Sequence, residues 1–282
     1  MKTIRIIPRL DIKGPNLVKG IHLEGLRVLG KPEDLAKFYY DNGADELFYQ
    51  DVVASLYERN SLKDMITKTA KKISIPLTVG GGIRTIRDIR SVLRYGADRV
   101  CINTAAIKNP EFIRQASRNF GSSTILVAIE AIKQFDGKYF AYIDNGREHT
   151  GLEAVSWAQR IEELGAGEIL ITSVDREGTG LGFDIELTKK IADSVSIPVI
   201  AHGGACDEAD IKEVITKGNA DAVALASIIH YDYIKNRRIG NIGIDEGNIE
   251  FLKSKKSFSK IKVNTIRNIK EYLKLNSISV RL

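Results

Sequence analysis

The sequence has little cysteine, little proline and no long apolar run. Its 282 residues include 2 Cys and 6 Pro, which is too few cysteines for a disulfide framework and fits a reducing compartment. The longest apolar runs, such as 197–201, are far shorter than the ~20 residues of a membrane span. Pro8 interrupts the N-terminus too early for the apolar core of a signal peptide. We therefore expect a soluble, cytoplasmic protein without a membrane partner.

The amino-acid composition excludes several non-globular classes. Hydrophobic residues make up 43% of the chain and charged residues 28%, which is ordinary for a folded protein and excludes collagen and acidic disordered tails. The net charge is +6 at pH 7. A basic balance allows anionic partners, either phosphorylated metabolites or nucleic acid, and does not choose between them.

Short apolar runs of β type alternate with amphipathic helical patterns along the chain. The predicted strands cover 4–10, 46–53, 75–79, 99–103, 124–130, 168–173, 197–201 and 221–226. A further strand at 139–142 follows a hairpin turn at Asp136-Gly137. Eight repeats of strand and helix are typical of a parallel sheet, and at this length they favour a closed (β/α)8 TIM barrel. We expect residues 1–282 to form this one domain.

The two halves of the sequence resemble each other. Gly43-Ala44 returns as Gly165-Ala166, and Ile75-Pro76 returns as Ile197-Pro198, both at an offset of 122 residues. Such ordered matches predict two half-barrels, at about 1–122 and 123–282. The stretch 235–262 fits neither half. It carries eight Lys or Arg and is interpreted as a solvated loop, with contact to a partner or a polyanion as the alternative.

Glycine-rich turns follow predicted strands at equivalent places in the two halves. Gly80-Gly81-Gly82 and Gly203-Gly204-Ala205 each stand between a strand and a helix, where glycine lets backbone N–H groups approach an anion closely. Asn103-Thr104 and Ala226-Ser227 end the next strand in each half and offer further donors. The pattern predicts two phosphate sites at the barrel mouth, and an ordinary tight turn is the structural alternative.

One acidic side chain ends the first predicted strand of each half. In an eight-stranded barrel, Asp11 and Glu130 would face each other across the mouth, where two carboxyls can serve as general base and general acid. A turn or a helix cap is the alternative role for each of them.

Strand alternation also places charged residues on the inward face at the other end of the barrel. Because buried charges need partners, we expect a ring of two Arg and two Glu, either as a structural plug or as a gated pore. The four residues are Arg5, Glu46, Arg99 and Glu168.

Several motifs together are specific to one enzyme family. In chain order they are Leu10-Asp11, Val18-Lys19-Gly20, Gly43-Ala44-Asp45-Glu46, the run 76–84, the run 102–106, the run 164–170 and Asp175-Arg176-Glu177-Gly178-Thr179. On these motifs the chain resembles the cyclase subunit of imidazole glycerol phosphate synthase, an enzyme of histidine biosynthesis. The resemblance runs from residue 5 to about 230 and resumes in the helix predicted at 264–275.

The resemblance implies a (β/α)8 barrel that acts as a lyase and needs no metal or organic cofactor. The implied substrate is phosphoribulosyl-formimino-aminoimidazole-carboxamide ribonucleotide, which carries two phosphates. Ammonia from a partner glutaminase, bound as a heterodimer, passes through the barrel core and attacks this substrate. The products are imidazole glycerol phosphate and aminoimidazole carboxamide ribotide.

The family's functional residues carry over position by position. Asp11 and Glu130 match the two catalytic acids, Lys19 lies in the mobile active-site loop, and Asp98 lies at the face that contacts the glutaminase. The phosphate and substrate positions match Gly82, Asn103, Thr104, Thr172, Glu177, Gly178, Gly204, Ala226 and Ser227. The ammonia gate matches Arg5, Glu46, Arg99 and Glu168, with Arg99 in place of the usual Lys.

The sequence departs from the family pattern at several inward positions. Glu130 replaces the usual Asp, Arg9 replaces a small Cys, and Gln50 and His202 are more polar than usual. The basic stretch at 235–262 is also additional. We expect the Arg9 guanidinium to pair with Asp11 or Glu130, to lower the pKa of that acid and to narrow the ammonia route.

These departures leave two other functions open. One is a divergent paralogue that supplies ammonia for amidation of a nucleotide-linked sugar in surface-polysaccharide synthesis. The other is a non-catalytic scaffold that docks a glutaminase, for which Asp11 would be dispensable. Binding of nucleic acid through the basic stretch is the least favoured interpretation.

Overall fold

The structure is a computed structural model that describes residues 2–52, 60–236 and 260–282. Most of the basic stretch at 235–262 therefore lies outside the described residues, and its interpretation as a solvated loop stays a prediction. Within the described ranges, no helix is both long enough and apolar enough to cross a membrane.

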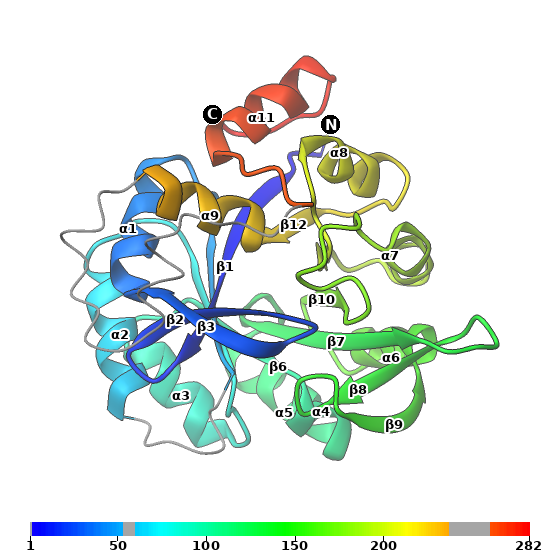
Figure 1. The fold of residues 1–282 in the computed structure, drawn as a ribbon. Helices are drawn as coiled ribbons and strands as arrows, with labels where there is room; N and C mark the ends of the chain where they lie inside the picture. Colours follow the sequence, from blue (N-terminus) through cyan, green and yellow to red (C-terminus); the bar gives the residue numbers. More distant parts are fainter. Residues whose placement is uncertain (1, 53–59, 237–259) are drawn as a thin grey trace.

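Eight parallel strands form a closed barrel (Figure 1). Hydrogen bonds join β12 to β1 and β7 to β10, so the ring of strands closes on itself. The strands are β1 (Arg5–Lys13), β4 (Leu47–Asp51), β5 (Leu77–Gly80), β6 (Arg99–Ile102), β7 (Ile125–Lys133), β10 (Glu168–Ser173), β11 (Val199–His202) and β12 (Ala222–Leu225). The (β/α)8 barrel predicted from the sequence is confirmed, with strand ends within three residues of those expected.

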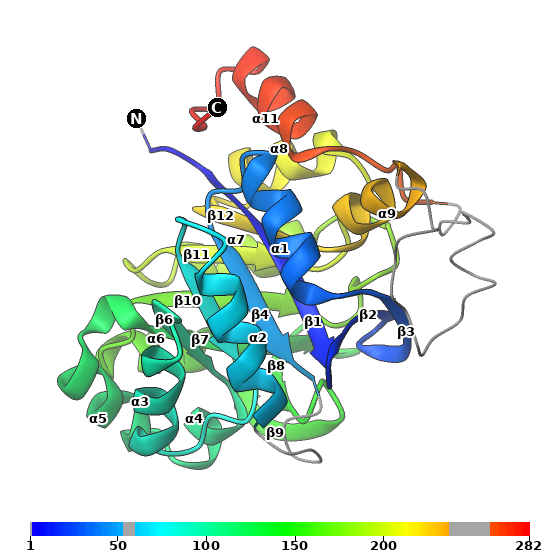
Figure 2. The same ribbon diagram turned by 90° about the vertical axis from the view of Figure 1, so that its left-hand side faces the viewer.

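Helices surround the barrel, and Figure 2 shows α1 and α2 lying over the outer face of its first strands. Paired side chains fix two of the helix starts, because Thr85 with Asp88 and Asp207 with Asp210 form capping boxes. The helices are α1 (Pro32–Asp41), α2 (Asn60–Ala70), α3 (Ile86–Arg94), α4 (Thr104–Lys108), α5 (Glu111–Phe120), α6 (Ala154–Glu163), α7 (Ile185–Ala192), α8 (Glu208–Thr216), α9 (Ser227–Asn236) and α11 (Ile266–Leu275).

Two antiparallel hairpins extend the barrel beyond its mouth. β2 (Asn16–Ile21) and β3 (Glu24–Gly30) continue from β1, and β8 (Tyr139–Ile143) and β9 (Glu148–Glu153) continue from β7. The sequence predicted β8 and its turn but not the other three strands. The burial pattern explains part of this, because β9 is mostly exposed and lacks the apolar alternation by which strands are recognised.

The interior of the barrel is layered along its axis. Successive strand residues point to opposite faces, so Ile6 and Leu10 pack outward under the helices while Ile7 points inward. Ile7, Phe48 and Leu170 belong to an apolar cluster inside the strands. Charged residues lie on both sides of this apolar layer and form the two sites described below.

Candidate active site

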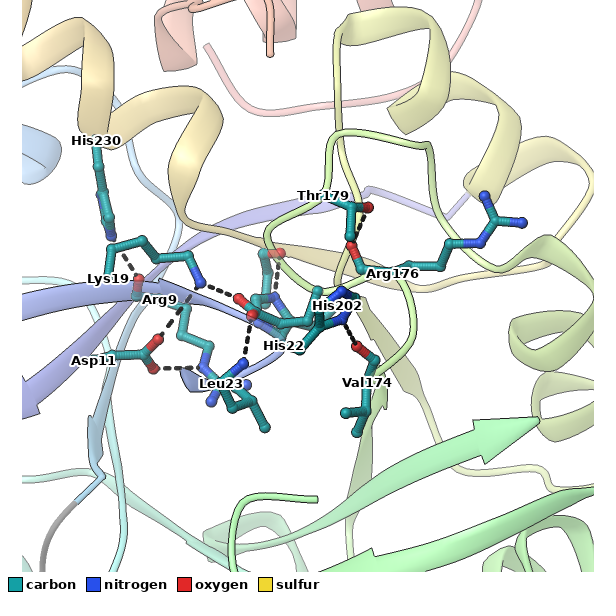
Figure 3. A network of polar contacts seen from close by, with 12 residues as sticks. Arg9, Asp11, Lys19, His22, Leu23, Val174, Arg176, Thr179, His202 and His230 are labelled. Atoms are coloured by element: carbon teal, nitrogen blue, oxygen red, sulfur yellow. Dashed lines mark hydrogen bonds and ion pairs between the residues drawn. The ribbon is translucent and has the colours of Figure 1, made fainter. Parts of the chain in front are cut away.

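Asp11 lies between two cations at the end of β1 (Figure 3). Arg9 Nε donates to Asp11 Oδ1 at 3.0 Å, and Lys19 Nζ lies 3.9 Å from Asp11 Oδ2. All three side chains are buried. Burial alone would raise the pKa of Asp11, but the charges of Arg9 and Lys19 outweigh it and hold this pKa below its usual range. The expected pairing of Arg9 with an acid is confirmed, and Asp11 is ionised at neutral pH.

Glu130 occupies the equivalent place on β7, four strands away around the ring. Its Oε2 accepts a hydrogen bond from the backbone N–H of Gly146 at 2.9 Å. Burial raises the pKa of Glu130 to about 7, against the opposing effects of Arg9, Gly146 and Asn103. The environments thus push the pKa values of the two acids apart, which is the pattern of one proton donor and one proton acceptor.

A cavity of about 690 Å³ opens beside Glu130, a volume typical of sites for small molecules. Gly82, Asn103 and Thr104 line one part of it, and Arg9 and Thr172 line another. The first glycine turn, Gly80-Gly81-Gly82, packs closely on the backbone at the end of β4. A Cβ at position 81 would collide with the carbonyl group of Asp51. This turn and the start of α4 bring the predicted first phosphate residues together at the mouth.

The second glycine turn, Gly203-Gly204-Ala205, lies beside the start of α9 at Ser227. A Cβ at position 204 would collide with the carbonyl group of Gly182, so glycine is required there. Ala226 and Ser227 line the same hollow, as do Glu177 and Gly178. Its volume is only about 20 Å³, which holds about one water molecule. A phosphate group therefore fits only after some of the residues that line this hollow move.

The β2–β3 hairpin contributes Lys19 to the lining of this hollow, and Ile261 contributes another part. Glu177 holds the hairpin against the mouth. Glu177 forms an ion pair with Lys19 Nζ, and its Oε2 accepts from the backbone N–H of Leu23 at 2.9 Å. The Glu177 carbonyl oxygen accepts from the N–H of His22 at 3.0 Å, and His22 Nδ1 contacts the carbonyl oxygen of Val174 at 2.8 Å. Lys19, expected in a mobile loop, is in this structure part of a hairpin closed over the second turn.

Three buried polar atoms at the mouth have no hydrogen-bond partner among the described residues. They are Asn103 Oδ1, Thr172 Oγ1 and His202 Nε2. Buried polar groups in folded proteins are nearly always paired, so these atoms are suited to a polar ligand. In the same described part of the chain, no group of three or more His, Cys, Asp or Glu side chains is arranged to hold a metal ion.

The predicted ring of charges is present at the opposite end of the barrel. Arg5 Nη1 lies 2.8 Å from Glu46 Oε1, and Arg99 Nη1 lies 2.6 Å from Glu168 Oε2. Arg5 also pairs with Glu168, and Arg99 lies 3.5 Å from Glu46, so each cation contacts both acids. Asp98, which directly precedes β6 at this end, is exposed and accepts from the N–H of Leu77 at 2.8 Å.

A buried histidine fixes the backbone next to Asp11. Tyr39 Oη lies 2.6 Å from His230 Nδ1, and His230 Nε2 lies 3.0 Å from the carbonyl oxygen of Arg9. Because a carbonyl only accepts, Nε2 carries the proton and Nδ1 accepts from the tyrosine. Burial is the main cause that lowers the pKa of His230 to about 4.

We expect His230 to make the protein less stable as the pH falls from about 6.5 to 4. The unfolded histidine takes up its proton near pH 6.5 and the folded one only near pH 4. The unfolded state therefore binds more protons, and the free energy of unfolding falls by up to about 1.4 kcal/mol per pH unit. Urea titrations followed by Trp157 fluorescence should show a shallower slope in His230→Asn. The same change at exposed His149 is the control, and equal slopes in both variants would contradict the assignment.

The chain is similar to known proteins over most of its length. The family model described as "Histidine biosynthesis protein" matches residues 5–235. The chain belongs to this family. Among its relatives is the imidazole glycerol phosphate synthase subunit HisF of Legionella pneumophila, 56% identical over 204 residues, which cover 72% of this chain and 96% of the relative. The HisF subunit of Lactococcus lactis is 47% identical over 255 residues, covering 90% of this chain and 95% of the relative.

Family membership agrees with the sequence prediction, but sequence reasoning missed several contacts of the site. The Gly146 N–H that binds Glu130 comes from the turn after β8, and the only available signal was the turn-forming Asp144-Asn145-Gly146 sequence. Tyr39 and His230 gave no signal, because they are 191 residues apart. The structure brings the predicted mouth residues together and places the predicted ring residues at the far end of the barrel.

Proposed function

We propose that this protein is the cyclase subunit of an imidazole glycerol phosphate synthase. As a lyase it would convert phosphoribulosyl-formimino-aminoimidazole-carboxamide ribonucleotide and ammonia to imidazole glycerol phosphate and aminoimidazole carboxamide ribotide. The observation that carries the proposal is the pair of buried acids, Asp11 and Glu130, whose pKa values are shifted in opposite directions at one barrel mouth. The family's HisF members support the same reaction.

In this proposal the two acids divide the proton transfers between them. Glu130 is partly protonated near pH 7 and donates to a leaving group, whereas Asp11 is held ionised and accepts a proton from the attacking nitrogen. Positioned acids and bases typically contribute 10²- to 10⁴-fold to the rate of such steps. Arg9 keeps Asp11 ionised, at the cost of making it a weaker base.

The two glycine turns are proposed to bind the two phosphates of the substrate. The residues of the first are Gly82, Asn103 and Thr104, and those of the second are Gly204, Ala226 and Ser227. Thr172 lines the same cavity, and its hydroxyl has no hydrogen-bond partner among the described residues. Glu177 and Gly178 line the hollow at the second turn. They also contact the β2–β3 hairpin, because Glu177 accepts from the N–H of Leu23 and a Cβ at position 178 would lie 2.7 Å from the Gly20 carbonyl oxygen.

Ammonia is proposed to enter through the ring of Arg5, Glu46, Arg99 and Glu168. A glutaminase subunit would dock at this end, where Asp98 is exposed, to form a heterodimer in the cytoplasm. The apolar layer above the ring suits an uncharged molecule such as ammonia. Arg9 lies between this layer and the mouth cavity and would narrow the route.

We also propose that residues 1–282 are one domain.

Turnover with free ammonium tests the proposal without the partner subunit. We expect the wild-type protein to convert the ribulosyl-formimino ribotide, and Glu130→Asp to be about 10- to 100-fold slower, because the shorter side chain withdraws the carboxyl from its position by more than active-site geometry tolerates. Product formation by chromatography is the measurement.

The same substitution at Glu163, an exposed residue of α6, is the matched control and should leave turnover unchanged. Absence of turnover in both the wild type and Glu130→Asp would contradict the proposal. That result would favour the paralogue that supplies ammonia to a nucleotide-linked sugar.

A further inference from the structure

His202 is a buried histidine at the barrel mouth that the proposed chemistry does not use. It is the last residue of β11, pairs in register with Thr172 and Ala224, and directly precedes the second glycine turn. Its side chain is 5% exposed. Figure 3 shows it near the cluster of Arg9, Asp11 and Lys19.

The hydrogen bond on one side of the ring determines what the other side can do. His202 Nδ1 lies 3.0 Å from the carbonyl oxygen of Ala224, which only accepts, so Nδ1 carries the proton. Burial, reinforced by the charge of Arg9, holds the pKa of His202 well below its usual range, so the ring is neutral. Nε2 is then a hydrogen-bond acceptor, and it has no partner among the described residues.

Charged side chains of β1 and β2 act on the His202 imidazole. Arg9 and Asp11 come from β1 and Lys19 from β2. Lys19 is already paired with Glu177, and Arg9 Nε with Asp11. The imidazole therefore stays an acceptor in a setting where the cations nearby have acidic partners of their own.

The position of His202 identifies the kind of donor that suits this acceptor. His202 lines the same small hollow as Gly204, Ala226 and Ser227. A phosphate held there would belong to an ester, and the groups next to the ester in a sugar or polyol phosphate are hydroxyls, which donate. We propose that His202 binds the substrate by accepting, at Nε2, a hydrogen bond from the hydroxyl group that lies beside the phosphate at the second glycine turn.

This inference deepens the proposed function and rests on it for the identity of the substrate. His202 contributes specificity for phosphates that carry a neighbouring hydroxyl over phosphate alone. Because the hollow has room for only about one water-sized group, binding requires some of its lining residues, such as Lys19 of β2 or Ile261, to move.

Calorimetric binding of two probes, D-ribulose 5-phosphate and inorganic phosphate, tests the assignment without turnover. His202→Asn keeps a donor for the Ala224 carbonyl but removes the acceptor at the Nε2 position. We expect it to bind ribulose 5-phosphate about tenfold more weakly than the wild type, the effect of one lost hydrogen bond, and to bind inorganic phosphate equally well. His202→Gln places an oxygen acceptor near the Nε2 position and should recover much of the loss.

His149→Asn, at an exposed site on β9, is the matched control and should bind both probes as the wild type does. An equal loss for both probes in His202→Asn, or no loss for either, would overturn the inference. So would a wild type that does not prefer ribulose 5-phosphate to phosphate. If the preference depends on His202 but free ammonium gives no turnover, the inference stands and the proposed function fails.

Discussion

Asp11→Asn is expected to lower ammonium-dependent turnover by about a thousandfold. The substitution removes the ionised acceptor at the mouth, and acid-base groups contribute 10²- to 10⁴-fold to such reactions. Turnover at saturating ribotide and ammonium is the measurement. A scaffold that only docks a glutaminase predicts no turnover even in the wild type, so a large loss in Asp11→Asn separates an enzyme from a docking protein.

The variant also leaves the buried Arg9 without its acidic partner, which lowers stability. Thermal unfolding must therefore show that Asp11→Asn is folded at the assay temperature. Asp41→Asn, at the exposed end of α1, provides the same chemical change away from the mouth and should keep full activity. Comparable activity in a folded Asp11→Asn protein would exclude Asp11 from the chemistry.

Glu168→Ala should lower the free energy of unfolding by about 3 kcal/mol. Glu168 is almost fully buried and pairs with both Arg5 and Arg99, so its loss leaves two cations to share Glu46. Breaking a buried ion pair typically costs 3–5 kcal/mol. The lower end applies here, because the Arg5 side chain is 24% exposed and water can reach it. Denaturant titration measures the difference.

Glu186→Ala is the matched control for this prediction. Glu186 also pairs with two cations, Lys133 and Lys190, but its side chain is 48% exposed. Exposed ion pairs contribute roughly 0–1 kcal/mol, so this variant should remain close to wild type. An equal loss of unfolding free energy in the two variants would contradict the prediction, because it would show that the ion pairs of Glu168 with Arg5 and Arg99 stabilise the fold no more than an exposed pair does.

The sequence alone was sufficient to predict the positions that follow from strand periodicity. Alternation along β1 placed Arg5, Arg9 and Asp11 on one face, and the ring and the Arg9–Asp11 pair are as expected. Position at a strand end was likewise sufficient for Glu130 and the two glycine turns. These inferences hold because a closed barrel converts position along a strand directly into depth inside it.

Contacts between distant segments could not be predicted in this way. Lys270 of α11 forms a buried ion pair with Asp45 at 2.8 Å, across 225 residues of sequence. The contacts that Glu177 makes with the β2–β3 hairpin depend on how far that hairpin bends over the mouth. Single-sequence periodicity reports which face a residue occupies, but it does not report which loop meets which.

Each acid of the mouth also lies at the base of a hairpin. Asp11 is paired in register with Val18 of β2, and Glu130 with Tyr142 of β8. The backbone that carries each carboxyl is thus hydrogen-bonded to the strand that would have to bend if its hairpin opened. Movement of either hairpin would therefore strain the backbone that carries its acid. A substitution that loosens a hairpin would thus also change the position of a catalytic carboxyl.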